Sequence, residues 1–256
     1  VLNELREKVE QGLKADYITL SGSGEPTLNS QIKPLIEGIK KITDIPVAVL
    51  TNATLFPDED VRQACLLANL VVPSLDAPDQ ATFEKINQPQ SDLDIKAIID
   101  SLIEFRGQFK GQLWLEIFLI EPINTSDKHI EKFKSIISKI NPDKIQLNTA
   151  VRPTAYEGVQ KLSPEKIHNI AEKLGPKAEV VATFSPSKRG TDIKTTAETV
   201  LSMLKRRPCS LEDICSGLGI HKNEALKYVG HFQDKQLITT ENRDGVIYYK
   251  VEEDHI

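Results

Sequence analysis

The first 185 residues alternate between stretches with helical hydrophobic spacing and short apolar runs rich in β-formers. Leu2, Leu5, Val9 and Leu13 recur at helical spacing, and the apolar run 17–20 follows them. The same cycle repeats five more times. Its helices are predicted at 32–42, 58–68, 93–105, 128–140 and 164–174, and its strands at 47–50, 70–72, 113–120, 145–147 and 180–184. Strands that alternate with helices predict an α/β fold with a parallel sheet and right-handed crossovers.

The predicted order begins with a helix, whereas a βα barrel begins with a strand. We therefore expect one strand and the loop after it to lie upstream of Val1. The first residue is not a methionine, and the chain has only one, Met203. The sequence is accordingly interpreted as a fragment of a longer protein.

A second, smaller unit follows the segment 185–190, which mixes turn formers with charge and predicts a linker. Helical spacing returns at 196–204, 211–217 and 223–237, and 238–251 predicts a hairpin that turns at Asp244-Gly245. This is the element order of a winged-helix domain. We predict a partial barrel over residues 1–187 and a winged-helix domain over residues 195–256.

Composition places the chain among globular proteins, with 39% hydrophobic and 27% charged residues. No apolar run approaches the ~20 residues that span a bilayer, no export signal opens the chain, and three cysteines cannot build a disulfide framework. We therefore predict a cytoplasmic protein with no membrane contact. Residues 195–256 hold eight Lys and Arg against ten Asp and Glu, which argues against tight DNA binding and favours a protein partner.

Polar residues follow five successive predicted strands. In parallel α/β barrels the loops that leave the carboxyl ends of the strands build the active site. The clusters are Ser23, Gly24 and Glu25, then Thr51 and Asn52, then Ser74 and Asp76, then Glu121, and finally Asn148 with Arg152. Five such clusters at one edge of a sheet predict a binding site there.

The segment 17–28, YITLSGSGEPTL, resembles the glycine-and-glutamate motif after the second strand of radical SAM enzymes. LTNA at 50–53, SLDA at 74–77 and QLNT at 146–149 are similar to the signatures of that family at its third, fourth and sixth strand ends. Over residues 1–185 the chain is most similar to the iron–sulfur oxidoreductases of the wyosine-synthesis type. The resemblance implies a partial (β/α)6 barrel that lacks its first strand.

This resemblance implies a 4Fe–4S cluster that donates an electron to S-adenosylmethionine (SAM) and generates a 5′-deoxyadenosyl radical. It also implies a reductant such as ferredoxin or flavodoxin. The family's CxxxCxxC motif lies after its first strand, so we expect it upstream of Val1. Cys65, Cys209 and Cys215 do not match the motif and are interpreted as small hydrophobic residues. We assign no catalytic residue and no metal ligand within this chain.

Several strand-end residues have a physical reason to contact SAM. Gly24, with Gly22, lets the backbone turn and approach a ligand, and Glu25 accepts hydrogen bonds from an ammonium group. Ser74 and Asp76, two positions apart, suit the hydroxyls of a ribose. The cofactor-binding residues that we predict are Ser23, Gly24, Glu25, Pro26, Thr51, Asn52, Ser74, Asp76, Asn148 and Arg152.

Structural interpretations remain open for several of these residues. The glycines also suit a plain strand-to-helix turn, Asp76 a cap or turn in the segment 76–79, and Arg152 a surface ion pair. Glu116 lies inside a predicted strand and is a weaker candidate that faces the barrel lumen, where a carboxylate needs a partner.

Two other classes of function compete with the radical SAM hypothesis. One is a ligand-sensing barrel with a winged-helix regulatory or docking module. The other is an ordinary barrel enzyme such as an aldolase or phosphate-binding isomerase, against which stand the missing GxxxxGK[ST] loop and the lack of a lysine at a strand end. Wyosine enzymes act on a tRNA guanosine, but this chain shows no basic face, so the sequence leaves the substrate open.

Overall fold

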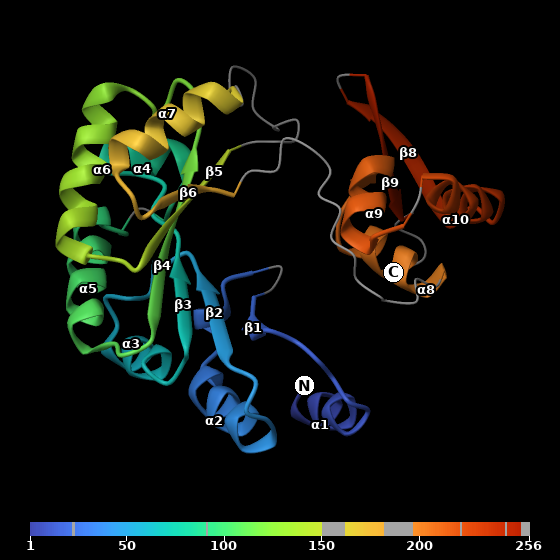
Figure 1. The fold of residues 1–256 in the computed structure, drawn as a ribbon, viewed down its shortest axis with the longest axis horizontal. Coiled ribbons are helices and arrows are strands. Elements are labelled where there is room, and N and C mark those ends of the chain that lie inside the picture. The colour runs from blue at the N-terminus through green and yellow to red at the C-terminus, as the bar shows by residue number, and fades with distance from the viewer. Residues whose placement is uncertain are drawn as a thin grey trace. The chain divides into compact units, whose positions relative to one another are not determined.

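The chain forms two compact units, Val1–Ala182 and Thr183–Ile256, each with its own hydrophobic core (Figure 1). The computed structural model describes residues 1–21, 24–90, 92–149, 162–181, 197–220, 222–243 and 245–251. We refer to the two parts as unit 1 and unit 2.

Unit 1 contains a parallel sheet whose six strands lie in the order of the sequence. The strands are β1 (Ile18–Leu20), β2 (Val47–Thr51), β3 (Leu70–Pro73), β4 (Gln112–Leu119), β5 (Lys144–Thr149) and β6 (Ala178–Val180). Each strand pairs with the next one along the chain, so right-handed crossovers place every connecting helix on the same face of the sheet. Figure 1 shows α2, α3, α5, α6 and α7 on one side of the strands. The sheet therefore has a helix-covered face and an opposite face, which we call the open face.

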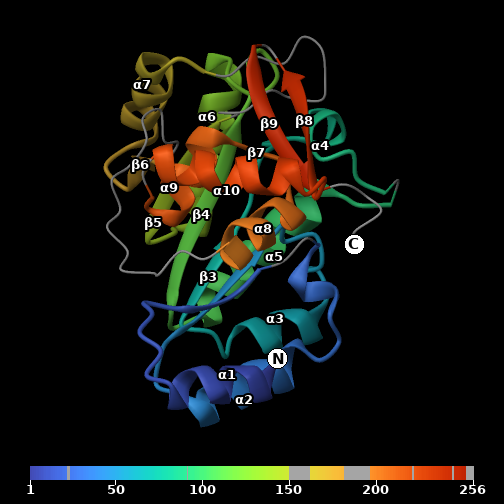
Figure 2. The same cartoon turned by 90° about the vertical axis from the view of Figure 1, so that its right-hand side faces the viewer.

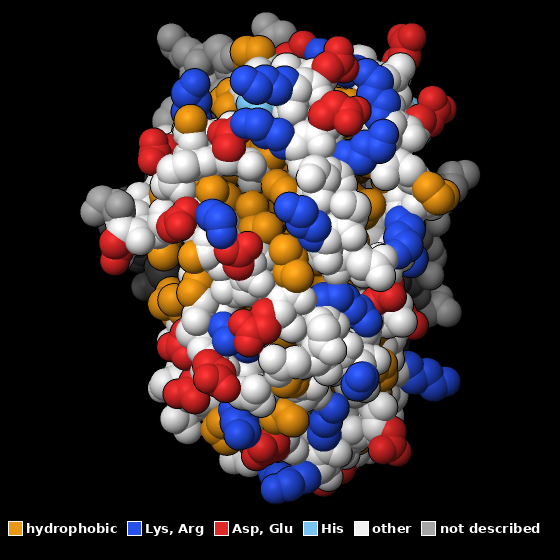
Figure 3. Space-filling view, turned by 90° about the vertical axis from the view of Figure 1, so that its left-hand side faces the viewer, with side chains coloured by type: hydrophobic (Ala, Val, Ile, Leu, Met, Phe, Trp, Pro, Cys, Tyr) orange, Lys and Arg blue, Asp and Glu red, His pale blue; other side chains and the backbone are white. Residues whose placement is uncertain are grey.

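The helices of unit 1 are α1 (Leu2–Glu10), α2 (Ile32–Ile42), α3 (Glu59–Cys65), α4 (Gln80–Ile86), α5 (Ile95–Gln108), α6 (Asp127–Ile140) and α7 (Pro164–Leu174), with a short 3-10 helix η1 (Pro26–Leu28). Side chains of Asp58, Asp79, Asp94, Ser126 and Ser163 accept backbone N–H groups at their first turns. Seen from the helix-covered side, charged groups of both signs are interspersed with apolar ones (Figure 3). Among the described residues, no helix has the length and apolar character that crossing a bilayer requires.

Strand β4 shows how the two faces differ. Leu113, Leu115, Ile117 and Leu119 are fully buried against the helices, whereas the alternate residues 114, 116 and 118 are half-buried on the open face. The open face is apolar at one end, where Ala48, Leu70 and Val72 pack with Tyr17 and Trp114.

The described residues of unit 2 form three helices and a three-stranded antiparallel sheet (Figure 2). Its elements are α8 (Ala197–Arg206), β7 (Cys209–Ser210), α9 (Leu211–Leu218), α10 (Lys222–Asp234), β8 (Ile238–Arg243) and β9 (Val246–Val251). Ser210 and Asp213 form a reciprocal capping box at the start of α9. Gly245 has a φ of +81° beside the hairpin turn, a conformation that glycine adopts without strain.

Most predicted elements lie where the hydrophobic spacing placed them, with two corrections. The segment 76–79 does not end in a plain turn, because Asp79 caps a helix, α4, that the sequence reasoning missed. The last strand of the sheet is Ala178–Val180 and not 180–184, since it pairs with β5 from Ile145↔Ala178 to Leu147↔Val180. Residues 182–184 lie outside the described residues.

A fully buried asparagine ties the ends of β3 and β4 together. The Asn124 Nδ2 donates to the Asp76 carbonyl oxygen at 2.8 Å and to the Phe118 carbonyl oxygen at 2.7 Å. Its Oδ1 accepts from the Ile120 N–H at 2.7 Å. One side chain thereby satisfies three backbone groups where the strand ladder stops.

Replacing Asn124 by alanine is expected to lower the free energy of unfolding of unit 1 by about 2–4 kcal/mol, because buried polar groups without partners cost about 1–3 kcal/mol each. Urea denaturation followed by Trp114 fluorescence measures the loss. Asn87→Ala is the matched control, since Asn87 is exposed and its side chain makes a single hydrogen bond among the described residues, 3.3 Å long; a loss below about 0.5 kcal/mol is expected there. Equal losses of unfolding free energy for the two variants would contradict the stabilising role of Asn124.

Candidate functional site

The strand-exit residues come together because all strands of a parallel sheet end at the same edge. Glu25 and Thr51 meet at the ends of β1 and β2, and Ser74, Glu116 and Asn148 meet across β3, β4 and β5. The structure thus gathers the predicted residues into two hydrogen-bonded groups. Ser23 and Arg152, which we also predicted to bind the cofactor, lie outside the described residues, as does Gly22.

Glu25 joins the loop after β1 to the end of β2. Its Oε1 accepts from the Thr27 N–H at 3.0 Å, the Thr27 hydroxyl at 2.6 Å and the Thr51 hydroxyl at 2.6 Å. Its Oε2 accepts from the Asn52 N–H at 2.7 Å. A carboxylate offers about four acceptor positions, so most of this capacity serves the protein itself. Three donors bond to Oε1 and one to Oε2, so Oε2 is the oxygen that retains an acceptor position for the ammonium group that Glu25 is predicted to bind.

Asn52 and Gly24 lie at the exposed rim of this group. The Asn52 Oδ1 accepts from the N–H and the hydroxyl of Thr54, at 3.0 and 2.7 Å, while its amide nitrogen has no hydrogen-bond partner within the described part of the chain. A Cβ at Gly24 would meet no atom within 4 Å. Pro26 begins η1, where its missing N–H costs nothing. Space and an amide donor are therefore available beside Glu25.

The second group centres on Glu116. The Ser74 hydroxyl donates to Glu116 Oε2 at 3.3 Å, and the Asn148 amide donates to Glu116 Oε1 at 3.5 Å. Sequence reasoning ranked Glu116 as a weak candidate, although the alternation along β4 placed it on the same face as the neighbouring strand-exit residues. Glu121, at the end of the same segment, is held by an ion pair with Lys166 of α7.

Asp76 and Ser74 share no hydrogen-bond partner among the described residues, and their common contact with a ribose stays a prediction. The Asp76 Oδ1 accepts from the Phe118 N–H at 2.9 Å and its Oδ2 from the Asn87 amide at 3.3 Å. The carboxylate thus extends the β3–β4 pairing beyond the strand, which fits the structural interpretation of this residue. Burial raises the pKa of Asp76 to about 6, and the nearby Glu116 carboxylate adds to this rise, while the two hydrogen bonds oppose it.

This raised pKa predicts a pH-dependent effect of Asp76→Asn. A carboxyl group with a pKa of about 6 when folded and about 4 when unfolded binds its proton more tightly in the folded chain, so its ionisation removes stability as the pH rises from about 4 to about 6. The stability of Asp76→Asn relative to the parent chain should therefore increase by roughly 2 kcal/mol between pH 4 and pH 7.

Urea unfolding at the two pH values measures this difference. Asp44→Asn, in the exposed segment before β2, is the control and should show no comparable change. A stability difference for Asp76→Asn that is the same at both pH values would show that the carboxyl is not the titrating group.

The described residues do not fit an iron–sulfur cluster. Cys65 is fully buried in α3, where burial and the nearby Glu25 carboxylate raise the pKa of its thiol to about 12. Cys209 is also buried, and Cys215 lies apart from it on α9. Among the described residues, no three His, Cys, Asp or Glu side chains converge to hold a metal ion.

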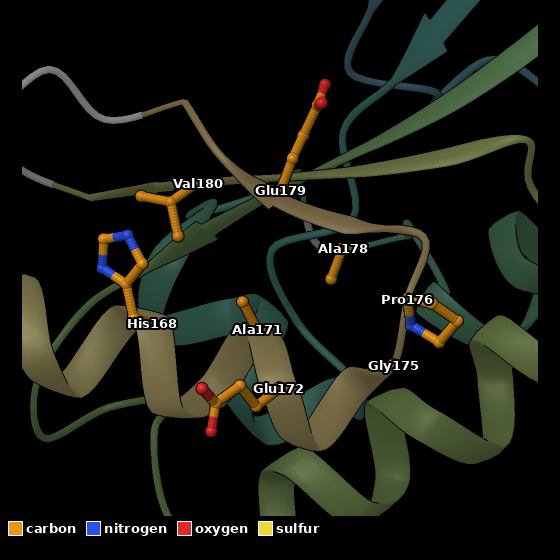
Figure 4. A pocket seen from close by; sticks show the side chains of 8 residues that line it. All are labelled: His168, Ala171, Glu172, Gly175, Pro176, Ala178, Glu179 and Val180. Carbon is orange, nitrogen blue, oxygen red and sulfur yellow. The ribbon is translucent and has the colours of Figure 1, made fainter.

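A cavity of about 570 Å³ lies at the β6 edge of the sheet and does not coincide with the strand-exit residues (Figure 4). Figure 4 shows His168 and Glu172 of α7 on one side and the backbone of β6 on the other. The Nδ1 of His168 lies 2.6 Å from the Pro164 carbonyl oxygen, within its own helix. The lining is His168, Ala171, Glu172, Gly175, Pro176, Ala178, Glu179 and Val180. Few polar groups converge there, so we place the candidate site at the strand exits.

Curated relatives share sequence with much of the chain. It is 35% identical over 98% of its length to a protein named GTPase Obg of Brachyspira hyodysenteriae, and 33% identical over 66% of its length to a UPF0026 protein of Methanocaldococcus jannaschii. The chain spans 37% and 51% of the lengths of these two proteins. No protein-family model matches it.

Solved structures of radical SAM enzymes share the fold. A radical SAM methyltransferase of Sphaerobacter thermophilus matches with a TM-score of 0.54 and 19% identity, covering 72% of this chain and 57% of that one. A domain of a pyruvate-formate lyase-activating enzyme of Bacteroides vulgatus matches with a TM-score of 0.51 and 22% identity, covering 64% of this chain and 97% of that one. SuiB of Streptococcus suis, solved bound to SAM, matches with a TM-score of 0.51 and 16% identity, covering 71% and 42%. The α/β fold of the chain is thus that of radical SAM enzymes.

Proposed function

We propose that the chain is the SAM-binding body of a radical SAM enzyme. The observation that carries the proposal is the sequential six-stranded parallel sheet, whose first exit bears the SGSGEP segment and whose fold matches three solved radical SAM enzymes. One of those enzymes was solved with SAM bound. Beside a reduced cluster, SAM held by these strand-exit residues would supply radical chemistry to a substrate.

The described residues suit the polar parts of SAM. Glu25 retains acceptor capacity at Oε2 for the ammonium group, and the Asn52 amide nitrogen, which has no partner among the described residues, is a donor for the carboxylate. Asn148 and Ser74, which contact Glu116 at 3.5 and 3.3 Å, have long bonds that a ligand hydroxyl can replace. Asp76 and Thr51 hold neighbouring backbone and side-chain groups in place. These roles are proposals for each residue, and Ser23, Gly24, Pro26 and Arg152 remain proposed contacts.

We do not propose a GTPase activity, although one relative carries that name. The chain corresponds to 37% of that protein. Its 256 residues contain no GxxxxGK[ST] segment to cradle phosphates.

We propose that cluster ligands are supplied from elsewhere on a longer polypeptide. Strand β1 pairs only with β2 among the described residues, which leaves its outer edge able to receive another strand. The relatives extend well beyond the matched region. A strand beside β1, followed by a CxxxCxxC loop, would complete the sheet and bring the cluster to the strand-exit edge.

Reductive cleavage of SAM tests the proposed function. A longer protein that carries CxxxCxxC and is loaded with iron and sulfide should produce 5′-deoxyadenosine under dithionite, whereas residues 1–256 alone should produce none. A longer protein with the three cysteines changed to serine is the control for adventitious iron. A fully loaded longer protein that leaves SAM intact would refute the radical SAM assignment.

For unit 2 we propose a winged-helix fold that docks a protein and not DNA. Its order of helix, short strand, two helices and hairpin, with β7 paired to β9, supports the winged-helix assignment. The helix that would enter a DNA groove, α10, carries Lys222 and Lys227 beside Glu224 and Asp234. Exposed Leu226 on α10 and Val246 and Ile247 on β9 add apolar surface of the kind that protein interfaces use.

The chain should therefore not bind duplex DNA tightly, because few phosphates can be neutralised and little counterion release drives association. A gel shift at about physiological salt should show dissociation constants no tighter than the non-specific range of ~10⁻⁴ to 10⁻⁶ M. Changing both Glu224 and Asp234 to lysine should strengthen binding and confirms that the assay detects this surface. Sub-micromolar binding by the unmodified chain would contradict the docking proposal.

A further inference from the structure

A row of polar side chains crosses the open face of the sheet, from the end of β3 to β6. Ser74, just beyond β3, pairs with Glu116 of β4, which pairs with Gln146 of β5, and Gln146 pairs with Glu179 of β6. Alternate residues of a strand point to the same face, and all four belong to the face opposite the helices. We call these four residues the polar row.

Glu116 differs from the other carboxylate of the polar row in its partners. Glu179 is exposed, accepts from the Gln146 amide at 3.1 Å and has the Lys144 ammonium 3.8 Å away. Glu116 is half-buried, and within the described part of the chain its partners are two neutral donors at 3.3 and 3.5 Å. A half-buried carboxylate without a cation is costly, and both of its oxygens retain capacity for short, charge-assisted hydrogen bonds.

Aromatic side chains flank Glu116 along the same strand. Trp114 lies two residues before it and Phe118 two residues after it, so all three side chains are on the open face and neighbouring Cα atoms are about 6–7 Å apart. The Lys144 ammonium lies 4.6 Å from the centroid of the Trp114 ring, so this ring system already receives one cation. The Trp114 Nε1 is buried without a hydrogen-bond partner in the described residues. Below it the floor is apolar, formed by Ala48, Leu70 and Val72.

We infer that Glu116 is the residue that recognises the substrate, and that the substrate is a small molecule with an ammonium group beside an apolar ring or chain. The carboxylate binds the ammonium group, Trp114 and Phe118 contact the apolar part, and the apolar floor excludes water. The charge of the site selects a cationic substrate, because the Glu116 carboxylate and the nearby Asp76 carboxylate repel an anionic group placed between them. This inference rests on the proposed function, since it assigns the open face to the substrate of that enzyme.

Trp114 provides the measurement, because it is the only tryptophan of the chain and gives a single indole N–H resonance. Residues 1–256, labelled with ¹⁵N, are titrated with benzylammonium, with benzyl alcohol as the uncharged analogue of the same shape, and with benzoate. We expect a saturable shift of the indole resonance with benzylammonium alone. Glu116→Gln should weaken that binding about 10- to 100-fold, and Glu131→Gln, exposed on α6, should leave it unchanged.

A second variant covers the case in which Glu116→Gln fails to fold. Gln146→Lys places an internal cation beside Glu116 at its register partner and should abolish benzylammonium binding. Equal shifts with benzyl alcohol, no saturable shift with benzylammonium, or unchanged binding in both variants would overturn the inference.

The experiment needs neither SAM nor iron, so its failure is separable from failure of the proposed function. If residues 1–256 do not bind benzylammonium as expected but the loaded, longer protein cleaves SAM, the amine site is wrong and the radical SAM assignment stands. If residues 1–256 bind benzylammonium as expected but the loaded, longer protein leaves SAM intact, the radical SAM assignment is wrong. Glu116 then remains an amine-binding residue.

Discussion

The handedness of strand crossovers determines what this molecule presents to a ligand. Six parallel strands in sequence order, joined by right-handed connections, place all connecting helices on one face. That face buries the main core, while the other face stays only partly covered within the described residues. Because the strands are parallel, their carboxyl ends also meet at one edge, where Glu25, Asn52, Ser74 and Asn148 lie. Both the strand-exit groups and the polar row are consequences of this topology.

Polar side chains at the strand exits satisfy the backbone before they can serve a ligand. Where a strand ladder ends, N–H and C=O groups lose their partners and must find others. Asn124 supplies three such bonds, Asp76 accepts from Phe118, and Glu25 accepts from Thr27 and Asn52. A motif that indicates cofactor contacts therefore also contains residues that hold the loops in shape. The acceptor and donor capacity that remains, at Glu25 Oε2 and the Asn52 amide, distinguishes the candidates for ligand contact.

Local periodicity predicted the fold well because each helix carries its own signals. The bounds of α2 and α7 match their predicted ranges, since apolar spacing and, for α7, a Ser-Pro start define them locally. Helix α4 was missed because its cap, Asp79, lies in a segment with turn composition. Asn124 was beyond sequence reasoning, because its partners on the ends of β3 and β4 depend on how those strands pair. The alternation along β4 placed Glu116 on the lumen side, but its two neutral partners among the described residues depend on which side chains β3 and β5 bring beside it.

The two separate cores change how the stability of this chain is to be understood. Val200, Leu204 and Ile214 belong to a core that shares no residue with the core beneath the parallel sheet. Cooperativity comes from a shared core, so two-state arithmetic applies to each unit and not to the whole chain. Trp114 emission reports only unit 1, whereas Tyr228, Tyr248 and Tyr249 belong to unit 2. A thermal scan with one optical probe therefore follows one domain, and a single melting temperature for the chain has no unique meaning.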